Sequence, residues 1–126
     1  MIVSVPVSIG ELVDKITILI IKEQNARDEV QLQNIKKELV LLQGKLDDLG
    51  IAGHPAFEPL LTILMGVNAK LWHIEDQVRI KTRNEEFDDE FIEIAKSVHS
   101  TNDERSAIKK QINTLFNSEI IEEKIY

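Results

Sequence analysis

The sequence predicts an all-α fold, an antiparallel helical bundle of four or five helices with a long central hairpin. Two stretches carry apolar residues at alternating spacings of three and four, which places them on one side of a helix. The first comprises Leu32, Ile35, Leu39, Leu42, Leu46 and Leu49. The second comprises Phe57, Leu60, Leu64, Val67, Leu71, Ile74 and Val78. Only residues 50–56 separate them, so we expect these two helices to pair as the hairpin.

Length and composition predict one helical domain over residues 1–126 of the chain. The chain is 43% hydrophobic and 29% charged, as is normal for a folded globular protein. Its formal net charge of −7 and the lack of a basic run disfavour nucleic-acid binding. The absence of cysteine excludes disulfides, thiolate catalysis and cysteine-ligated metals.

The first residues of the chain and its apolar runs indicate where in the cell the protein is expected. Residues 1–7 lack the basic start and the long apolar segment of a secretory signal. The longest apolar run, Ile16–Ile21, is too short to cross a bilayer. We therefore expect a cytoplasmic protein that does not insert into membranes.

The first helix is expected over residues 9–26, after a short extended N-terminal arm. Residues 2–7 are rich in β-branched side chains, and Pro6 keeps them out of a central strand. Ser8 and Glu11 have the spacing of a capping box, which marks a helix start. The helix that follows is apolar on nearly all sides, so we expect it to be central or to bury its extra face against another subunit.

The next two helices are expected over residues 28–49 and 57–84. Gly50 is a natural left-handed end for the first of them, and Pro59 fits the first turn of the second. Gly44 lies inside the earlier helix, where it either weakens that helix or permits the close approach of a neighbour.

Residues 87–117 are helical, as one helix or as two. The apolar spacing runs through Phe87 and Phe91, whereas Thr101 and Glu104 have the spacing of a second capping box. Both alternatives remain open. Residues 118–126 alternate weakly, a pattern compatible with pairing to the N-terminal arm.

A polar stripe accompanies the apolar seam of the third helix. It consists of Asn68, Trp72, Glu75 and Arg79. A flat ring beside hydrogen-bonding groups of both signs suits the recognition of a small polar molecule. In the structural interpretation, Glu75 and Arg79 form a helical ion pair worth about 0.2–0.5 kcal/mol, and Trp72 shields the edge of the seam.

Two further polar groups have both a structural and a functional interpretation. Asp14 and Lys15 interrupt the apolar first helix, so they need partners, either to fix helix register or to line a site. Asn102, Asp103 and Arg105 gather where a last helix would begin, which suits capping or an anion.

The sequence predicts no metal site and no cofactor. The acidic run over residues 85–93 has Glu side chains on one helical face, but Phe87 and Phe91 claim the buried side, so a solvated surface is favoured. The three histidines lack a helical ligand partner three or four positions away.

The opening and the ending of the chain resemble a family of small bacterial proteins of unknown function. The resemblance is carried by Val5–Leu19, by Ser118–Lys124 with Tyr126, and by positions such as Asn68, Trp72 and Asn102 between them. The chain departs from the family at Ile20 and Ile125, two positions where the resemblance implies a polar residue. The resemblance implies an uncharacterised, all-helical cytoplasmic protein and, through the genes near its members, a link to cell-surface polysaccharide metabolism.

Two classes of function follow from these observations. In the first, the chain is a non-enzymatic interaction or regulatory module that self-associates as a homodimer. In the second, polar residues facing into the bundle form a binding or catalytic site for a small anionic ligand. The candidate residues of that site are Asp14, Lys15, Asn68, Trp72, Glu75, Arg79, Asn102, Asp103 and Arg105.

Overall fold

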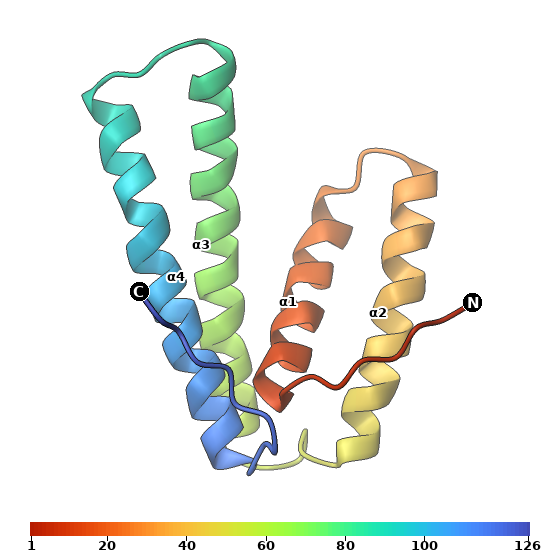
Figure 1. The fold of residues 1–126 in the computed structure, drawn as a ribbon. Helices are drawn as coiled ribbons and strands as arrows, with labels where there is room; N and C mark the ends of the chain where they lie inside the picture. The colour runs from red at the N-terminus through yellow and green to blue at the C-terminus, as the bar shows by residue number, and fades with distance from the viewer.

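The computed structural model describes residues 1–126 and contains four α-helices and no strands (Figure 1). The helices are α1 (Ile9–Asn25), α2 (Glu29–Leu49), α3 (Phe57–Arg83) and α4 (Asp89–Leu115). The prediction of an all-helical fold is confirmed. None of the four helices combines the length and the hydropathy that crossing a membrane requires.

Local capping explains where the helices begin and end. The Ser8 hydroxyl accepts a hydrogen bond from the Glu11 amide at 3.0 Å, and the Asp28 carboxylate accepts one from the Gln31 amide at 2.8 Å. Each bond satisfies a backbone donor that has no partner inside its helix. Gly50, with a φ of 67°, ends α2 in the left-handed conformation that glycine adopts without strain.

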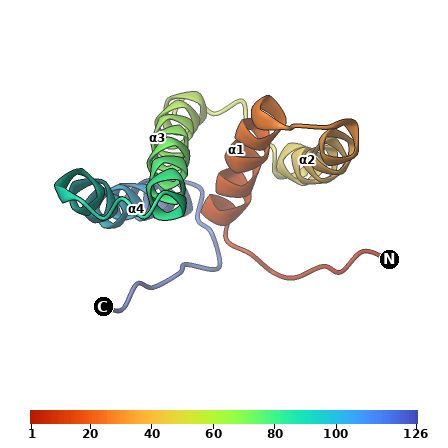
Figure 2. The same ribbon diagram turned by 90° about the horizontal axis from the view of Figure 1, so that it is seen from above.

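Helix α1 is the centre of the arrangement. Successive helices run in opposite directions, and α1 packs against α2, α3 and α4 (Figures 1 and 2). Its buried apolar side chains join those of α2, α3 and α4 in one core, which includes Val13, Leu39, Leu64 and Ile112. The nearly all-round apolar surface of this helix is therefore covered within one chain, the first of the two predicted outcomes.

The predicted hairpin between the second and third helices is not formed. No Cα atom of α2 lies within 8 Å of one in α3; the neighbouring pairs are instead α1 with α2 and α3 with α4. Both predicted seams do bury residues, such as Leu46 and Phe57, but in the core that surrounds α1. Periodicity identifies a face that must be covered and does not identify the covering helix. Here α1 covers the seam of α2, and α4 together with α1 covers the seam of α3.

Residues 89–115 form one continuous helix, which decides between the two alternatives for this region. Thr101 is therefore no helix cap: it is fully buried in the middle of α4, where its hydroxyl has no hydrogen-bond partner. The three-residue spacing of Thr101 and Glu104 also fits the interior of a helix. Glu104 is exposed there and Asn102 is half-buried, so the polar side chains after Thr101 are not enclosed in the core.

The two ends of the chain do not pair with each other. Residues 1–7 are exposed and belong to no helix or sheet. Ser8, the next residue, is buried. After α4, the chain reverses and runs back along that helix, as Figures 1 and 2 show. It also contacts the start of α1, where the Ser118 hydroxyl accepts a hydrogen bond from the Ile9 amide at 3.1 Å.

The hairpin of α3 and α4 projects beyond the tip formed by α1 and α2 (Figure 1). Between residues 75 and 100 no side chain is buried, whereas the buried residues of α3 end at Ile74 and those of α4 begin at Thr101. The core therefore occupies one half of the molecule, and the other half is a two-helix projection.

Candidate functional site

A buried carboxylate joins three helices. Asp14 of α1 is completely buried, and Arg105 of α4 binds both of its carboxylate oxygens, with Nε lying 2.9 Å from Oδ1. Asn68 of α3 donates from Nδ2 to the same Oδ1 at 2.8 Å and to the Thr17 hydroxyl at 2.7 Å. We call Asp14, Thr17, Asn68 and Arg105 the buried polar cluster. It brings together three of the residues that the sequence singled out.

Apolar packing on α1 strengthens the cluster. Asp14 and Thr17 lie one turn apart, and the Thr17 hydroxyl donates to the Asp14 carbonyl at 2.7 Å. Their neighbours Val13 and Ile16 belong to the core, so little water reaches the cluster. Hydrogen bonds in such surroundings are electrostatically stronger than in water, and an unpaired polar group there is more costly.

The charges of the cluster are stabilised by each other. Burial acts to raise the pKa of Asp14, but hydrogen bonds from Arg105 and Asn68 outweigh burial, so this pKa lies below its ordinary value. The hydrogen bond to Asp14 raises the pKa of Arg105. The pair is therefore held ionised.

The polar contacts continue from the cluster towards the start of α1. Lys109 lies 3.8 Å from the Asp14 carboxylate and also pairs with Glu11. Glu11 in turn lies 3.6 Å from Lys15, whose side chain is half-exposed. Lys15 thus belongs to the outer edge of the contacts and not to the buried polar cluster.

The start of α1 is fixed by α4 and by the last residues of the chain. The Asn113 side chain accepts a hydrogen bond from the Gly10 amide at 2.6 Å and donates to Glu122 at 3.2 Å. Glu122 also accepts a hydrogen bond from the Ser8 hydroxyl. Burial acts to raise the pKa of Glu122, but the bond from Ser8 and the other polar contacts lower it overall. A Cβ at Gly10 would lie 2.5 Å from the Lys109 carbonyl oxygen, so α1 and α4 meet backbone to backbone here.

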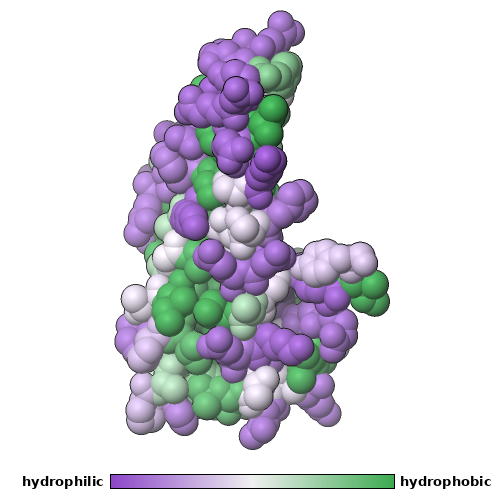
Figure 3. Space-filling view, turned by 90° about the vertical axis from the view of Figure 1, so that its left-hand side faces the viewer, coloured by the Kyte–Doolittle hydropathy of each residue, from purple (hydrophilic) through white to green (hydrophobic).

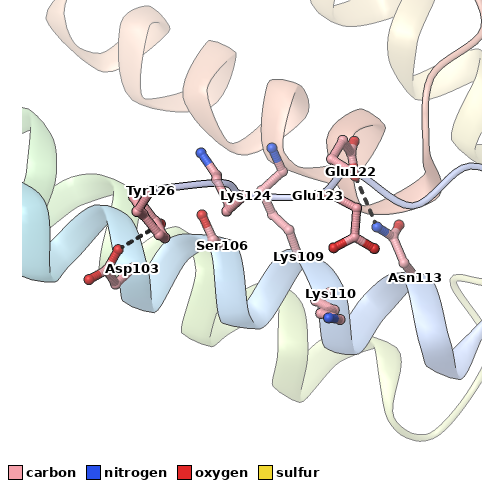
Figure 4. A pocket seen from close by; sticks show the side chains of 9 residues that line it. All are labelled: Asp103, Ser106, Lys109, Lys110, Asn113, Glu122, Glu123, Lys124 and Tyr126. Atoms are coloured by element: carbon pink, nitrogen blue, oxygen red, sulfur yellow. Dashed lines mark hydrogen bonds between the residues drawn. The ribbon is translucent and has the colours of Figure 1, made fainter.

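A cavity of about 330 Å³ lies between α4 and the C-terminal segment (Figure 4). The Tyr126 hydroxyl donates to Asp103 at 3.0 Å and holds the segment over one end of the cavity. The lining residues are Asp103, Ser106, Lys109, Lys110, Asn113, Glu122, Glu123, Lys124 and Tyr126. The lining includes both acidic and basic side chains, so the cavity favours neither an anion nor a cation.

The remaining candidates lie elsewhere. Trp72 and Arg79 are exposed, and each lines a hollow that lies between α3 and the region where α1 ends and α2 begins. Glu75 is also exposed, and after the hydrogen bond to Asp14 it contributes to the raised pKa of Arg105. Asn102 is half-buried. The stripe predicted on the third helix is therefore divided: Asn68 faces α1, and Trp72 and Arg79 face the solvent.

Several residues of these contacts escaped the sequence prediction. Asn113 carries no charge and fits an ordinary helix pattern, so nothing in the sequence distinguishes it. Glu122 lies in a segment that alternates only weakly. For Thr17, one signal was present: it lies three residues after Asp14, on the same face of an otherwise apolar helix.

The polar side chains of the arrangement bond one another and join three helices. Each polar side chain of the buried polar cluster is engaged with another member. No group of three histidine, aspartate or glutamate side chains is arranged to hold a metal ion. The cluster can fix the register of α1 against α3 and α4, since three helices must align for its bonds to form.

Comparison with known proteins gives a family but no activity. The model of DUF6165, a family of unknown function, matches residues 3–126. The chain belongs to this family. No curated protein and no solved structure matches it. The resemblance to an uncharacterised family that the opening and the ending suggested is confirmed, and the function has to be argued from the molecule itself.

Proposed function

We propose that the chain is a non-enzymatic helical module that pairs with a second copy of itself. The observation that carries the proposal is an apolar area on the outer face of α3 and α4, visible in the lower half of Figure 3. At this end of the hairpin, α3 exposes Ile63 and α4 exposes Leu115, and apolar neighbours on both helices are half-buried. We call Leu60, Ile63, Val67, Ile108 and Leu115 the outer patch.

An ion pair indicates that the two halves of the outer patch are side by side. Lys70 continues the face of Ile63 and Val67 along α3, and Glu104 precedes Ile108 on one face of α4. The Lys70 ammonium lies 3.8 Å from the Glu104 carboxylate, so the two faces meet across the hairpin. The patch therefore forms one surface, bordered by a cation and an anion.

A second copy of the chain fits such a surface. A two-fold axis places the same patch on both sides of an interface, which requires the patch to complement itself. Apolar side chains satisfy this requirement, and Lys70 of one protomer would lie beside Glu104 of its partner. Grouped apolar side chains on a surface are typical of interaction sites.

The projection of α3 and α4 also favours a partner. A helical segment gains most of its stability from the packing of its apolar face. The projecting residues 75–100 include no buried side chain, and Ile80, Phe87 and Ile92 are exposed.

The buried polar cluster has a structural role in this proposal. Asp14, Asn68 and Arg105 satisfy one another, which favours the fixing of helix register over the binding of a ligand in the bundle interior. The candidate ligand site inside the bundle is therefore not the function we propose.

Self-association is tested by the mass of the protein in solution. Light scattering coupled to size-exclusion chromatography is expected to give the mass of a dimer for the wild type. Ile63→Glu places a charge in the outer patch, where its desolvation opposes pairing, so this variant is expected to be a monomer. The side chain of Ile63 is 48% exposed, so the monomer is expected to keep its helical circular-dichroism spectrum.

A matched variant separates the patch from a general effect of charge. Val40→Glu introduces the same charge at an exposed apolar position of α2, outside the outer patch, and is expected to remain a dimer. A monomeric wild type, or a dimeric Ile63→Glu variant, would overturn the proposal.

A further inference from the structure

Three of the four arginines of the chain line one hollow of about 470 Å³. Arg27 lies in the loop between α1 and α2, and Arg79 and Arg83 lie on the projecting part of α3. The remaining lining residues are Asp76 and Thr82. Two segments that are far apart in sequence thus bring their guanidinium groups to the same place.

These three arginines have no acidic partner. None of them forms an ion pair, whereas Arg105 is engaged by Asp14. The chain has 22 acidic residues, so the lack of a partner is not due to a shortage of carboxylates. Like charges around one hollow repel each other and favour an anion between them. Guanidinium groups bind phosphate through two parallel hydrogen bonds, which makes a phosphate group the best match.

A second hollow, of about 420 Å³, adjoins the first at Arg27, which lines both. It contains Trp72 of α3 and Lys22 of α1. Trp72 is the only tryptophan of the chain and is 38% exposed, although most tryptophan side chains are largely buried. The ring therefore offers a flat apolar wall beside the positively charged hollow. We call the two hollows together the arginine groove.

The order of side chains along α3 defines the ligand further. Trp72, Asp76, Arg79 and Arg83 follow one another at spacings of four, three and four, so they lie on one face of the helix. With a rise of 1.5 Å per residue, they extend over about 16 Å. Along this line come a ring for stacking, a carboxylate that accepts hydrogen bonds from hydroxyls, and then two guanidinium groups. A nucleotide presents base, ribose hydroxyls and phosphates in the same order.

We propose that the arginine groove binds a nucleoside polyphosphate. The base stacks on Trp72, the ribose hydroxyls donate to Asp76, and the phosphates lie among Arg27, Arg79 and Arg83. The carboxylate of Asp76 would repel a phosphate but suits a sugar hydroxyl, which distinguishes a nucleotide from a simple polyphosphate. The site is separate from the outer patch, so it does not depend on self-association.

The single tryptophan provides a direct readout. Titration with ATP is expected to change the fluorescence of Trp72 to saturation, with free tryptophan amide as the control for absorption by the nucleotide. Calorimetry is expected to give the same dissociation constant. Pyrophosphate, which lacks the ring, and adenosine, which lacks the phosphates, are each expected to bind at least about tenfold more weakly, since each loses one set of contacts.

Matched variants locate the site. Arg79→Gln and Arg83→Gln each remove one charge-assisted contact, so each is expected to weaken ATP binding by about ten- to a hundredfold. Both side chains are exposed, so circular dichroism is expected to show unchanged helix content. Lys45→Gln removes a positive charge from α2 outside both hollows and is expected to bind as the wild type does. The Ile63→Glu variant, whatever its mass, is expected to retain binding.

Three results would overturn the proposal. One is the absence of saturable ATP binding by calorimetry. Another is equal loss of binding in Arg79→Gln and in Lys45→Gln, which would indicate a general effect of net charge. The last is pyrophosphate binding as tight as ATP binding, because the groove would then recognise charge alone and not a nucleotide.

Discussion

The absence of a side chain at Gly10 permits the contact between α1 and α4. In Gly10→Ala, the new Cβ would lie 2.5 Å from the Lys109 carbonyl oxygen and 2.8 Å from the Asn113 side chain. The backbone of Lys109 cannot move aside as a flexible side chain does, so α1 must shift. This shift strains the hydrogen bond from the Gly10 amide to the Asn113 side chain. We expect urea denaturation to show a loss of about 1–3 kcal/mol in the free energy of unfolding.

Gly66→Ala is the matched control. Gly66 is exposed in the interior of α3, and nothing lies within 4 Å of a Cβ added there. Alanine restricts the unfolded chain and favours the helix, so this variant is expected to gain about 0.5–1 kcal/mol. Equal effects of the two substitutions would contradict the close approach at Gly10.

The partners in the buried ion pair are expected to respond unequally to substitution. Arg105→Gln leaves the completely buried Asp14 carboxylate without its main partner, at an expected cost of about 3–5 kcal/mol. Asp14→Asn leaves Arg105 without its carboxylate partner. The Arg105 side chain is 27% exposed and reaches solvent, so the expected cost is only about 1–3 kcal/mol. Urea denaturation of both variants measures the difference.

An exposed pair serves as the comparison for these two variants. Lys15→Gln removes the Glu11–Lys15 pair, whose Lys15 side chain is half-exposed, and is expected to change the free energy of unfolding by less than about 1 kcal/mol. If Arg105→Gln were no more destabilising than Lys15→Gln, the buried polar cluster would not contribute to the fold.

At the scale of helices, the sequence predicts where each element begins and ends better than it predicts what the element touches. Ser8 and Asp28 signal helix starts through bonds to the backbone three residues away, and Gly50 signals a helix end through its own conformation. These interactions are local, so the sequence contains all the information that they need. The continuous α4 is the exception, since a capping-box spacing is also compatible with a helix interior.

Contacts between helices depend on information that no local pattern contains. The apolar seams of α2 and α3 identified the right faces but the wrong neighbour, because α1 covers the seam of α2, and α4 together with α1 covers that of α3. Gly44, inside α2, left open a close approach that the structure does not have, whereas Gly10, in the first turn of α1, makes one. In the candidate site, charge identified Asp14 and Arg105, while their uncharged partner Thr17 stayed hidden among ordinary helix residues.

At the scale of the whole molecule, acid is expected to destabilise the fold. The pKa values of Asp14 and Glu122 lie below their ordinary values of 3.8 and 4.5 in the folded chain. The unfolded chain therefore binds more protons in acid, and folding stability falls as pH falls. The contribution of these groups is fully present above the ordinary values and is lost as pH decreases through the lower folded values.

Denaturation as a function of pH tests this expectation. The free energy of unfolding of the wild type is expected to be steady above about pH 5 and to decline below it. Asp14→Asn cannot take up a proton at this position, so its decline is expected to be shallower. An acid dependence as steep as that of the wild type would show that Asp14 is not held ionised.

The bonds at the start of α1 also set an order in time. A ribosome releases the N-terminus first, so α1 emerges about a hundred residues before Asn113, Ser118 and Glu122, the residues that bind its first turn. Until then, the most apolar helix of the chain has α2 and α3 as complete neighbours and lacks these contacts with α4 and the C-terminal segment. The central helix is thus made before the other three helices and is among the last to have all of its contacts in place.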